Sequence, residues 1–277
     1  MHLSADIARA VTVALEEDIG AGDLSAALIP PEKSGGATVL SRETAVLCGS
    51  AWFEAVFRRL DPQMEMTWQC QDGDVLDPNQ SFVQLHGSAR ALLSGERVAL
   101  NFLQTLSATA TRTRSYVDAV TGLKAAILDT RKTIPGLRQA QKYAVTVGGG
   151  KNHRAGLYDG VLIKENHIMA AGGIRAALQA ALRATAPGVM IEIEVESLAE
   201  LTEAIENGAK LVLLDNFTII QLQQAVHLAA GRAQLEASGG VDIGTVRAIA
   251  ETGVDRISIG ALTKDLDAVD FSMRFQY

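Results

Sequence analysis

The sequence predicts an α/β protein in two parts, an α+β module followed by a parallel, TIM-like β/α barrel that need not reach eight strands. Three observations lead to this prediction. Short β-rich runs and turns dominate much of the chain before residue 88, apolar runs alternate with helical patterns from residue 124 onward, and polar residues stand where those later runs end. The 277-residue length accommodates two modest domains.

The N-terminal module is expected to open with a helix, because four apolar residues recur at helical spacing: Leu3, Ile7, Val11 and Leu15. Between residues 37 and 87, β-rich runs are separated by turn sequences such as DPQ and QDGD, and one helical stretch lies at 50–60. A long helix with an apolar stripe is expected over 89–120. We assign residues 1–110 to this first domain.

The barrel prediction rests on six short apolar runs separated by helical patterns. Continuous apolar runs of this kind are typical of parallel strands that are buried on both faces. The expected strands are 125–129, 161–164, 190–196, 211–215, 234–238 and 256–260. We assign residues 111–264 to the barrel and leave open whether the tail 265–277 returns to the first domain.

Composition and charge exclude several classes of protein. Hydrophobic residues make up 48% of the chain and charged residues 21%, which is ordinary globular usage and disfavours a disordered or fibrous protein. The net charge of −7 disfavours a nucleic-acid or acidic-membrane binder. Cys48 and Cys70 have no CxxC spacing and no histidine at ligand spacing, so we expect neither a zinc site nor a disulfide framework. With no basic leader and no long apolar stretch, we expect a cytoplasmic protein.

Residues with chemical function gather where the expected strands end. The loops that follow parallel strands converge on one mouth of a β/α barrel, and active sites are built there. One charged strand end is usually a solvated edge, but six strands that end in functional residue types indicate a site. These residues are Asp129, Thr130, Arg131, Lys132, Lys164, Glu194, Glu196, Asp215, Ser238, Gly239, Gly240, Gly260 and Ala261.

Charge is concentrated in one segment of this acidic chain. Residues 129–164 hold seven basic residues against two acidic ones, a net charge of +5. Because the whole chain has a net charge of −7, the remaining residues carry −12. A focused basic cleft attracts and orients carboxylates and phosphates, which indicates an anionic small substrate. For Arg138 and Lys142 the alternative of pairing with surface carboxylates stays open.

Glycines contribute a second signal for phosphate. Gly239, Gly240 and Gly260 stand in late barrel loops, where backbone N–H groups approach phosphates closely. The GGG run at 148–150 matches neither nucleotide-binding loop motif, since Asn152 follows Lys151. We expect that run to shape the loop that presents His153 and Arg154.

Glu194 and Asp215 stand on neighbouring strands of an otherwise basic mouth. Two carboxylates that face a polyphosphate suit Mg²⁺, which prefers hard oxygen ligands. A general acid or base role, or electrostatic stabilisation of a cationic sugar, are the alternatives.

The chain resembles the quinolinate phosphoribosyltransferase family, also called nicotinate-nucleotide pyrophosphorylases. The resemblance rests mainly on the continuous stretch 129–168, together with the motifs EVE, LLDNF, EASGG, GVDRISIGALTK, ERVALNFLQTLS and EEDIGAGDLS, in positions that span most of the chain. It implies an N-terminal α/β sandwich domain and a C-terminal barrel, in a homodimer whose partner covers each barrel mouth. It also implies conversion of quinolinate and phosphoribosyl pyrophosphate to nicotinate mononucleotide, pyrophosphate and CO₂, in the de novo route to NAD.

The resemblance further implies roles for individual residues. Arg131, His153 and Arg154 would grip the ring carboxylates of quinolinate, Thr130 would contribute its backbone, and Arg97 would reach into the partner's site. Glu194 and Asp215 would bind ribose hydroxyls and Mg²⁺, with no organic cofactor. Catalytic roles would fall to Lys132, Lys164, Glu194 and Asp215, and the 5′-phosphate would rest on Ser238, Gly239, Gly240, Ile259, Gly260 and Ala261.

The chain departs from the family pattern at Thr105, where an arginine often follows Gln104, and at the SATAT sequence of 107–111. Three alternatives stay open on the sequence. A sister family linked to molybdenum transport shares the fold, but the intact KNHRAGLYD and LIKENH segments favour quinolinate. A barrel lyase could use Lys164 as a Schiff-base nucleophile. A binding protein without activity is disfavoured, since every implied charged position holds the expected residue type.

Overall fold

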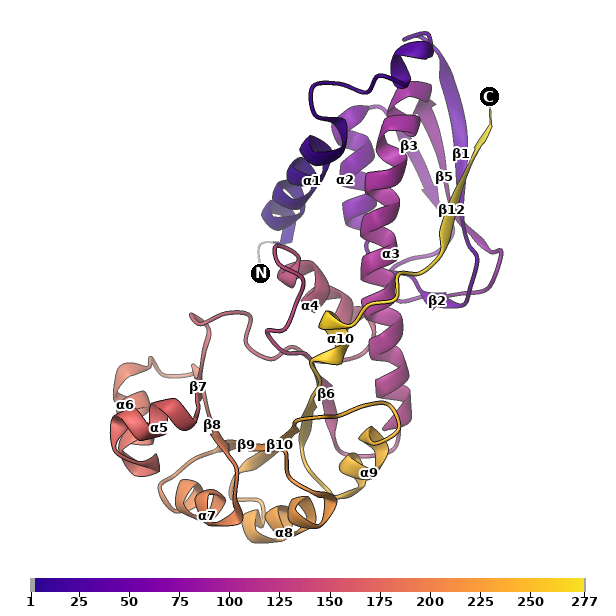
Figure 1. Ribbon diagram of the computed structural model, residues 1–277. Coiled ribbons are helices and arrows are strands. Elements are labelled where there is room, and N and C mark those ends of the chain that lie inside the picture. Colours follow the sequence, from indigo (N-terminus) through magenta and orange to yellow (C-terminus); the bar gives the residue numbers. More distant parts are fainter. Residues whose placement is uncertain (1–2, 277) are drawn as a thin grey trace. The chain divides into compact units, whose positions relative to one another are not determined.

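The computed structural model describes residues 3–276 (Figure 1). The chain divides into two compact units. The first contains the residues up to Arg114, the segment Ile134–Gly149 and the residues from Asp265 onward, and the second contains Ser115–Thr133 and Gly150–Lys264. Among the described residues, no helix combines the length and the hydrophobicity that crossing a bilayer requires.

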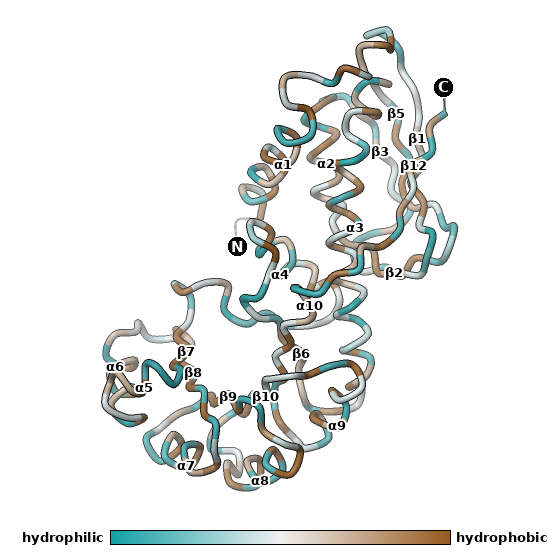
Figure 2. The backbone as a smooth tube through the Cα atoms, in the orientation of Figure 1, coloured by the Kyte–Doolittle hydropathy of each residue, from teal (hydrophilic) through white to brown (hydrophobic). Residues whose placement is uncertain are grey.

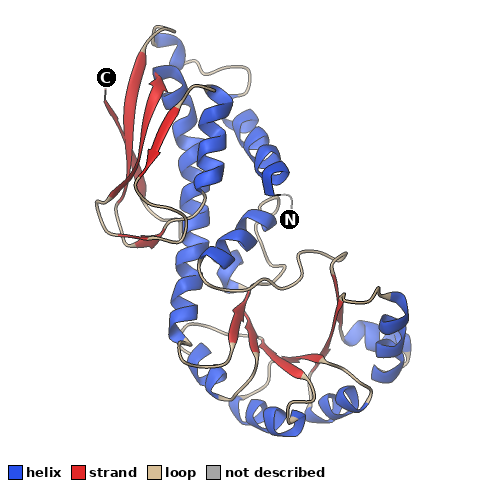
Figure 3. Ribbon diagram, turned by 180° about the vertical axis from the view of Figure 1, so that it is seen from behind, coloured by secondary structure: helices blue, strands red, loops and turns tan. Residues whose placement is uncertain are grey.

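The first unit is an α+β sandwich, as predicted. A four-stranded antiparallel sheet has the order β12, β1, β5, β3, and helices cover one of its faces (Figure 3). The buried core of this unit is mostly aliphatic and also contains several large aromatic side chains, among them Trp52, Phe53, Phe57 and Phe82. The elements are α1 (Leu3–Ile19), the 3₁₀ turn η1 (Ala26–Leu28), β1 (Ser34–Ser41), β2 (Ala45–Val46), α2 (Ser50–Leu60), β3 (Glu65–Trp68), β4 (Val75–Leu76), β5 (Ser81–Ser88), α3 (Ala89–Ala119), α4 (Arg138–Val147) and β12 (Phe271–Gln276).

The segment 134–149 lies with the first unit, whereas its position in the sequence had led us to assign it to the barrel. Its helix α4 packs apolar residues against the first core, and the hydroxyl of Tyr143 donates to Asp72 Oδ2 at 2.9 Å. The Tyr143 ring also lies 5.5 Å from the ring of Trp52. The C-terminal strand β12 pairs antiparallel with β1, from Gly36 opposite Gln276 to Ser41 opposite Phe271.

The second unit is a curved, six-stranded parallel sheet of order β6, β11, β10, β9, β8, β7. Helices lie along its convex side (Figures 1 and 3), and the helices α7 and α8 show both teal and brown stretches as amphipathic helices should (Figure 2). The elements are β6 (Ala126–Leu128), β7 (Gly160–Ile163), α5 (Glu165–Ala171), α6 (Ile174–Ala184), β8 (Met190–Val195), α7 (Leu198–Glu206), β9 (Leu211–Asp215), α8 (Ile219–Ala229), β10 (Gln234–Ser238), α9 (Val246–Glu251), β11 (Arg256–Ser258) and α10 (Ala261–Lys264).

The predicted barrel-type fold is confirmed, and each of the six strands coincides with a run that the sequence indicated, although β7 begins one residue earlier, at Gly160. Strands β6 and β7 form the two edges of this sheet, and a single parallel bridge joins Leu128 of β6 to Lys151. The expectation that the barrel could have fewer than eight strands therefore agrees with the six strands of this sheet in the described residues.

Helix caps hold the loops that follow two of the strands. The Ser197 hydroxyl accepts from the Glu200 N–H at 3.2 Å and starts α7, just after β8. Thr218 and Gln221 form a reciprocal capping box that starts α8, three residues after β9 ends at Asp215. These caps satisfy N–H groups that a helix start leaves without partners, so the short loops at the carboxyl ends of β8 and β9 are well defined.

Candidate active site

Four of the predicted site residues come together at the carboxyl ends of the strands. Lys164, directly after β7, forms an ion pair with Glu194 of β8. Burial raises the pKa of Asp215, and the nearby Glu194 carboxylate raises it further, while Lys164 and Lys132 lower it. Two cations and two carboxylates from four different loops and strands therefore act on one another.

Lys132 is held by its neighbours in the loop after β6. Its backbone N–H donates to Thr130 Oγ1 at 3.0 Å, and its carbonyl accepts from the Thr263 hydroxyl at 2.7 Å. A Cβ atom at Gly260 would lie 3.0 Å from Lys132 Cδ, so a side chain there would press on the lysine. Gly260 thus lets the lysine side chain pass closely over the loop after β11.

A tight loop follows β10 at Ser238, Gly239 and Gly240. Asn216, in the left-handed region with φ of 57°, donates its backbone N–H to the Ser238 carbonyl at 2.9 Å. Its side-chain amide donates to Asp215 Oδ2 at 2.9 Å. Gly239 has φ of +98°, and a Cβ atom there would lie 2.1 Å from Asn216 Oδ1. Asn216 therefore links the Asp215 carboxylate to the glycine loop.

Asn216 was missed by reasoning from sequence, although it stands in the LLDNF motif. Asparagine tolerates the left-handed backbone better than most residues, so an Asn next to a strand-end Asp was the available signal.

Ile259 and Ala261 flank Gly260 in the loop after β11. Ile259 is buried and donates its N–H to the Leu128 carbonyl at 2.9 Å, and Ala261 begins α10.

Arg131 and Arg154 form a second, basic part of the site. Burial lowers the pKa of Arg154, and the neighbouring Arg131 lowers it further, whereas Glu192 and Asp159 raise it. Arg154 also donates from Nη1 to the Gly160 carbonyl at 3.1 Å. Two guanidinium groups close enough to repel one another are well suited to a ligand with two carboxylates.

His153 does not present its ring as the sequence led us to expect. The side chain is only 7% exposed, and Nε2 lies 2.7 Å from Glu192 Oε2 and 3.7 Å from Glu236 Oε1. Nδ1 accepts the backbone N–H of Arg154 at 2.7 Å. Both ring nitrogens are thus engaged within the barrel, while the expected role was direct contact with a ring carboxylate.

Glu192 and Glu236 were also missed, and both are fully buried. Burial raises the pKa of Glu236, and the adjacent Glu192 raises it further, against the opposing effect of His153 and Arg256. The available signal was the alternation in MIEIEVE, because residues two apart on a strand share one face. Glu192 therefore faces the same side as Glu194, whereas Glu196 lies beyond the strand end and is exposed.

Arg97 belongs to a different compact unit from the other predicted site residues. It is an exposed residue of α3 in the first unit, whereas the other predicted site residues belong to the second unit.

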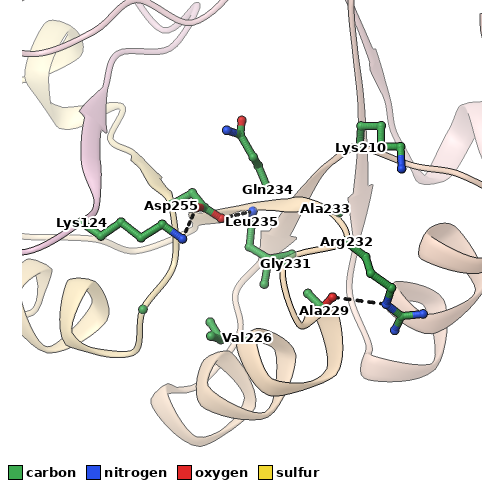
Figure 4. A pocket seen from close by; sticks show the side chains of 11 residues that line it. Lys124, Lys210, Val226, Ala229, Gly231, Arg232, Ala233, Gln234, Leu235 and Asp255 are labelled. Carbon is green, nitrogen blue, oxygen red and sulfur yellow. Dashed lines mark hydrogen bonds and ion pairs between the residues drawn. The ribbon is translucent and has the colours of Figure 1, made fainter.

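A cavity of about 250 Å³ lies at the opposite, amino-terminal ends of the strands (Figure 4). Two of the cations that line it, Lys124 and Arg232, have structural partners. Lys124 Nζ lies 2.5 Å from Asp255 Oδ1, and Arg232 donates to carbonyls at the end of α8, including that of Leu228 at 2.8 Å. Basic residues at helix ends commonly satisfy the last carbonyls, so we interpret this cavity as part of the scaffold.

The fold and the residues at the strand ends define a β/α-barrel enzyme that follows an α+β domain. Two family models match the chain, "Quinolinate phosphoribosyl transferase, N-terminal domain" over residues 23–107 and the corresponding C-terminal domain over residues 109–274. The chain belongs to the quinolinate phosphoribosyltransferase family.

Individual relatives agree with this assignment. A probable nicotinate-nucleotide pyrophosphorylase [carboxylating] of Bacillus subtilis is 42% identical over 93% of this chain and 89% of its own length. Quinolinate phosphoribosyltransferase [decarboxylating] 1b of Nicotiana tabacum is 39% identical, over 99% of this chain and 83% of its own. The solved structure of the nicotinate-nucleotide pyrophosphorylase of Francisella tularensis superposes with a TM-score of 0.95 at 44% identity, covering 98% of this chain and 96% of that one.

Proposed function

We propose that this protein transfers the phosphoribosyl group of phosphoribosyl pyrophosphate to the ring nitrogen of quinolinate. The products are nicotinate mononucleotide, pyrophosphate and CO₂, which is a step of NAD biosynthesis. Family membership supports the reaction, and the observation that carries it in this chain is the meeting of Lys132, Lys164, Glu194 and Asp215 at the strand ends.

The dicarboxylate is assigned to the basic part of the site. Arg131 and Arg154 repel one another, and a ligand with two adjacent carboxylates relieves that repulsion by pairing with both. The planar guanidinium also makes two parallel hydrogen bonds to one carboxylate, which orients the ring. Thr130 helps to hold the loop that carries Arg131 and Lys132.

The sugar donor is assigned to the glycine loops and the two lysines. The backbone of Ser238, Gly239 and Gly240 suits the 5′-phosphate, together with the segment 259–261, because these loops stand where late barrel loops bind phosphate. Lys132 and Lys164 face the negative charge that develops on pyrophosphate as it leaves. Positioning and electrostatic stabilisation are the main sources of rate enhancement in such a transfer.

Glu194 and Asp215 fit a Mg²⁺ ion that arrives with the donor. Their carboxylates are close enough for Glu194 to raise the pKa of Asp215, and hard oxygen donors suit this ion. When bound, Mg²⁺ supplies positive charge next to the pyrophosphate. The same two carboxylates also lie where they can stabilise positive charge on the ribose.

The bond changes balance with one proton taken from solvent. The bond between C1′ and the pyrophosphate oxygen breaks with its electron pair, C1′ develops oxocarbenium character, and the pyridine nitrogen forms the new bond to C1′. The ring nitrogen is then cationic. The bond from ring carbon 2 to its carboxylate breaks, CO₂ leaves, the electron pair remains on the ring, and a proton from solvent completes the product.

We further propose a cytoplasmic homodimer in which Arg97 of one protomer serves the site of its partner. The exposed position of Arg97 on α3 supports this role.

A Schiff-base lyase is disfavoured because the Lys164 Nζ is engaged in an ion pair with Glu194 instead of being presented to a carbonyl substrate. Failure of borohydride to trap a carbonyl substrate on Lys164 is the expected result.

The decisive experiment measures release of CO₂ and pyrophosphate with quinolinate, phosphoribosyl pyrophosphate and Mg²⁺, together and with each omitted. Both products are expected only in the complete mixture. Glu194→Gln and Asp215→Asn should each lower kcat by about 10²-fold or more, because each removes a charge that stabilises the transition state. Glu203→Gln, an exposed residue of α7, is the matched control. Release of CO₂ without the phosphoribosyl donor would contradict the proposal.

A further inference from the structure

A buried cluster of three side chains lies inside the barrel, and none of them has a part in the reaction steps above. His153, Glu192 and Glu236 each place one ring nitrogen or carboxylate oxygen within 4.8 Å of the others. Glu192 and Glu236 have no exposed surface, and the His153 side chain is 7% exposed. Burying two carboxylates is costly unless they are hydrogen-bonded or neutralised, so the cluster needs a physical explanation.

The hydrogen bonds of His153 fix which ring nitrogen carries the proton. Nδ1 accepts the backbone N–H of Arg154 at 2.7 Å and therefore has no hydrogen of its own in this arrangement. The ring hydrogen is on Nε2, which lies 2.7 Å from Glu192 Oε2 and donates to it. A metal ion at Nε2 would need the lone pair of that atom and would move the proton to Nδ1, opposite the Arg154 N–H. The donor set therefore fits a hydrogen-bonded triad better than a metal site.

The same histidine ties the Arg154 loop to three strands. Its backbone N–H donates to Asp129 Oδ1 at 2.9 Å, and Asp129 directly follows β6 and precedes the loop of Arg131. Its ring reaches Glu192 of β8 and Glu236 of β10. The next residue, Arg154, is attached to the ring through its own N–H. One network therefore locates the backbone that carries both guanidinium groups.

We propose that Glu192 is a positioning residue, which fixes the tautomer and orientation of His153 and through it places Arg154 beside Arg131 for a ligand with two carboxylates. This inference rests on the proposed function, since it concerns how the dicarboxylate substrate is held. Glu236 supports the arrangement from the other side. Burial, and then the charge of Glu192, raise the pKa of Glu236 to about 7, so below that pH this carboxyl holds a proton and adds no negative charge to the cluster.

Two substitutions separate the hydrogen bond from the volume of the side chain. Glu192→Gln keeps an acceptor oxygen for the His153 Nε2–H, whereas Glu192→Leu has a similar size and no acceptor. We expect the leucine variant to raise the KM and Kd for quinolinate by about tenfold or more, because small displacements of a binding group are costly. Its KM for phosphoribosyl pyrophosphate should change by less than about threefold, and the glutamine variant should stay within about threefold of the parent throughout. Glu203→Gln is again the control, and a thermal melt checks the fold of each variant.

A spectroscopic measurement on the unaltered protein tests the same network. In ¹⁵N-histidine-labelled protein, the resonances lost in His153→Gln should show hydrogen on Nε2 and none on Nδ1. This readout tests the tautomer of His153 even if the leucine variant does not fold. A purely structural role for Glu192 would not move the KM for one substrate alone.

The outcomes are distinct. Unaltered protein that makes no pyrophosphate from both substrates contradicts the proposed function. Active protein with a folded Glu192→Leu variant of unchanged quinolinate Kd overturns the positioning role alone. Hydrogen on Nδ1 of His153, or one transition-metal ion per chain that is lost in Glu192→Leu, also overturns it.

Discussion

Replacing Glu236 with glutamine is expected to stabilise the protein above neutral pH. Glu236 is fully buried and lies beside a second buried carboxylate, Glu192. Burial, followed by the charge of Glu192, raises the pKa of Glu236 from its ordinary value of 4.5 to about 7. Glutamine matches the shape of the protonated carboxyl and cannot ionise, so it removes the cost of charging this site.

The sign follows from proton binding by the two states. Between pH 4.5 and about 7 the folded protein keeps the Glu236 proton while the unfolded chain has lost it, so the free energy of unfolding falls as pH rises through this range. At 1.36 kcal/mol for each pKa unit, the full loss is about 3 kcal/mol above that range. Below pH 4.5 both states bind the proton, and the substitution should change stability little.

The assay is urea unfolding of the parent and Glu236→Gln between pH 4.5 and 8, followed by far-ultraviolet circular dichroism. Far-ultraviolet dichroism is needed because both tryptophans, Trp52 and Trp68, belong to the first unit and do not report on the barrel. The stability difference between variant and parent should grow with pH by about 3 kcal/mol, while other titrating groups cancel. A difference that is flat with pH, or that favours the parent at pH 8, would refute the reasoning. Glu203→Gln should give a flat difference near zero.

Three further predictions concern the scaffold. Gly239→Ala should raise the KM for phosphoribosyl pyrophosphate by about tenfold or more and lower the free energy of unfolding by about 1–3 kcal/mol, because the new Cβ atom would meet Asn216 and Gly239 has a φ of +98°. Gly244→Ala, whose Cβ atom would lie 3.4 Å from its nearest neighbour, is the control in both kinetics and thermal melts. Asp72→Ala should destabilise the first unit by about 1–2 kcal/mol in tryptophan-detected unfolding, since Asp72 accepts from two N–H groups at the start of α2 and from the Tyr143 hydroxyl; unchanged unfolding would contradict this. Asp255→Ala should lower the free energy of unfolding by about 1–2 kcal/mol and leave kcat unchanged, because Asp255 binds Lys124 and the Leu235 N–H at the end of the barrel away from the candidate site. A loss of activity in folded protein would count against the scaffold role.

The strands of the barrel were predictable because apolar runs and their spacing are local properties of the chain. Each expected run coincides with a strand, and Lys164, Glu194 and Asp215, which stand at or near the ends of three runs, do act on one another in the fold. Parallel strands bring their carboxyl ends to one edge, so the order of elements was enough to group these residues.

The segment 134–149 could not be placed in the same way. Nothing local distinguishes α4 from a barrel helix, and only its contacts with Trp52 and Asp72 show that it packs with the first unit. The direction of the His153 ring was equally out of reach, because Glu192 and Glu236 are remote from it in sequence and become its partners only when β8 and β10 lie in one curved sheet.

The amino-acid sequence by itself determined the α/β class, the positions of the six parallel strands, the basic segment in an acidic chain and the family. Those properties depend on residue type and spacing, which folding does not change. The tertiary structure alone decided which carboxylates are buried, that His153 faces inward, and that Asn216 joins Asp215 to the glycine loop. Burial and hydrogen bonding between distant residues set these features, since both depend on the environment that the whole fold creates around each group.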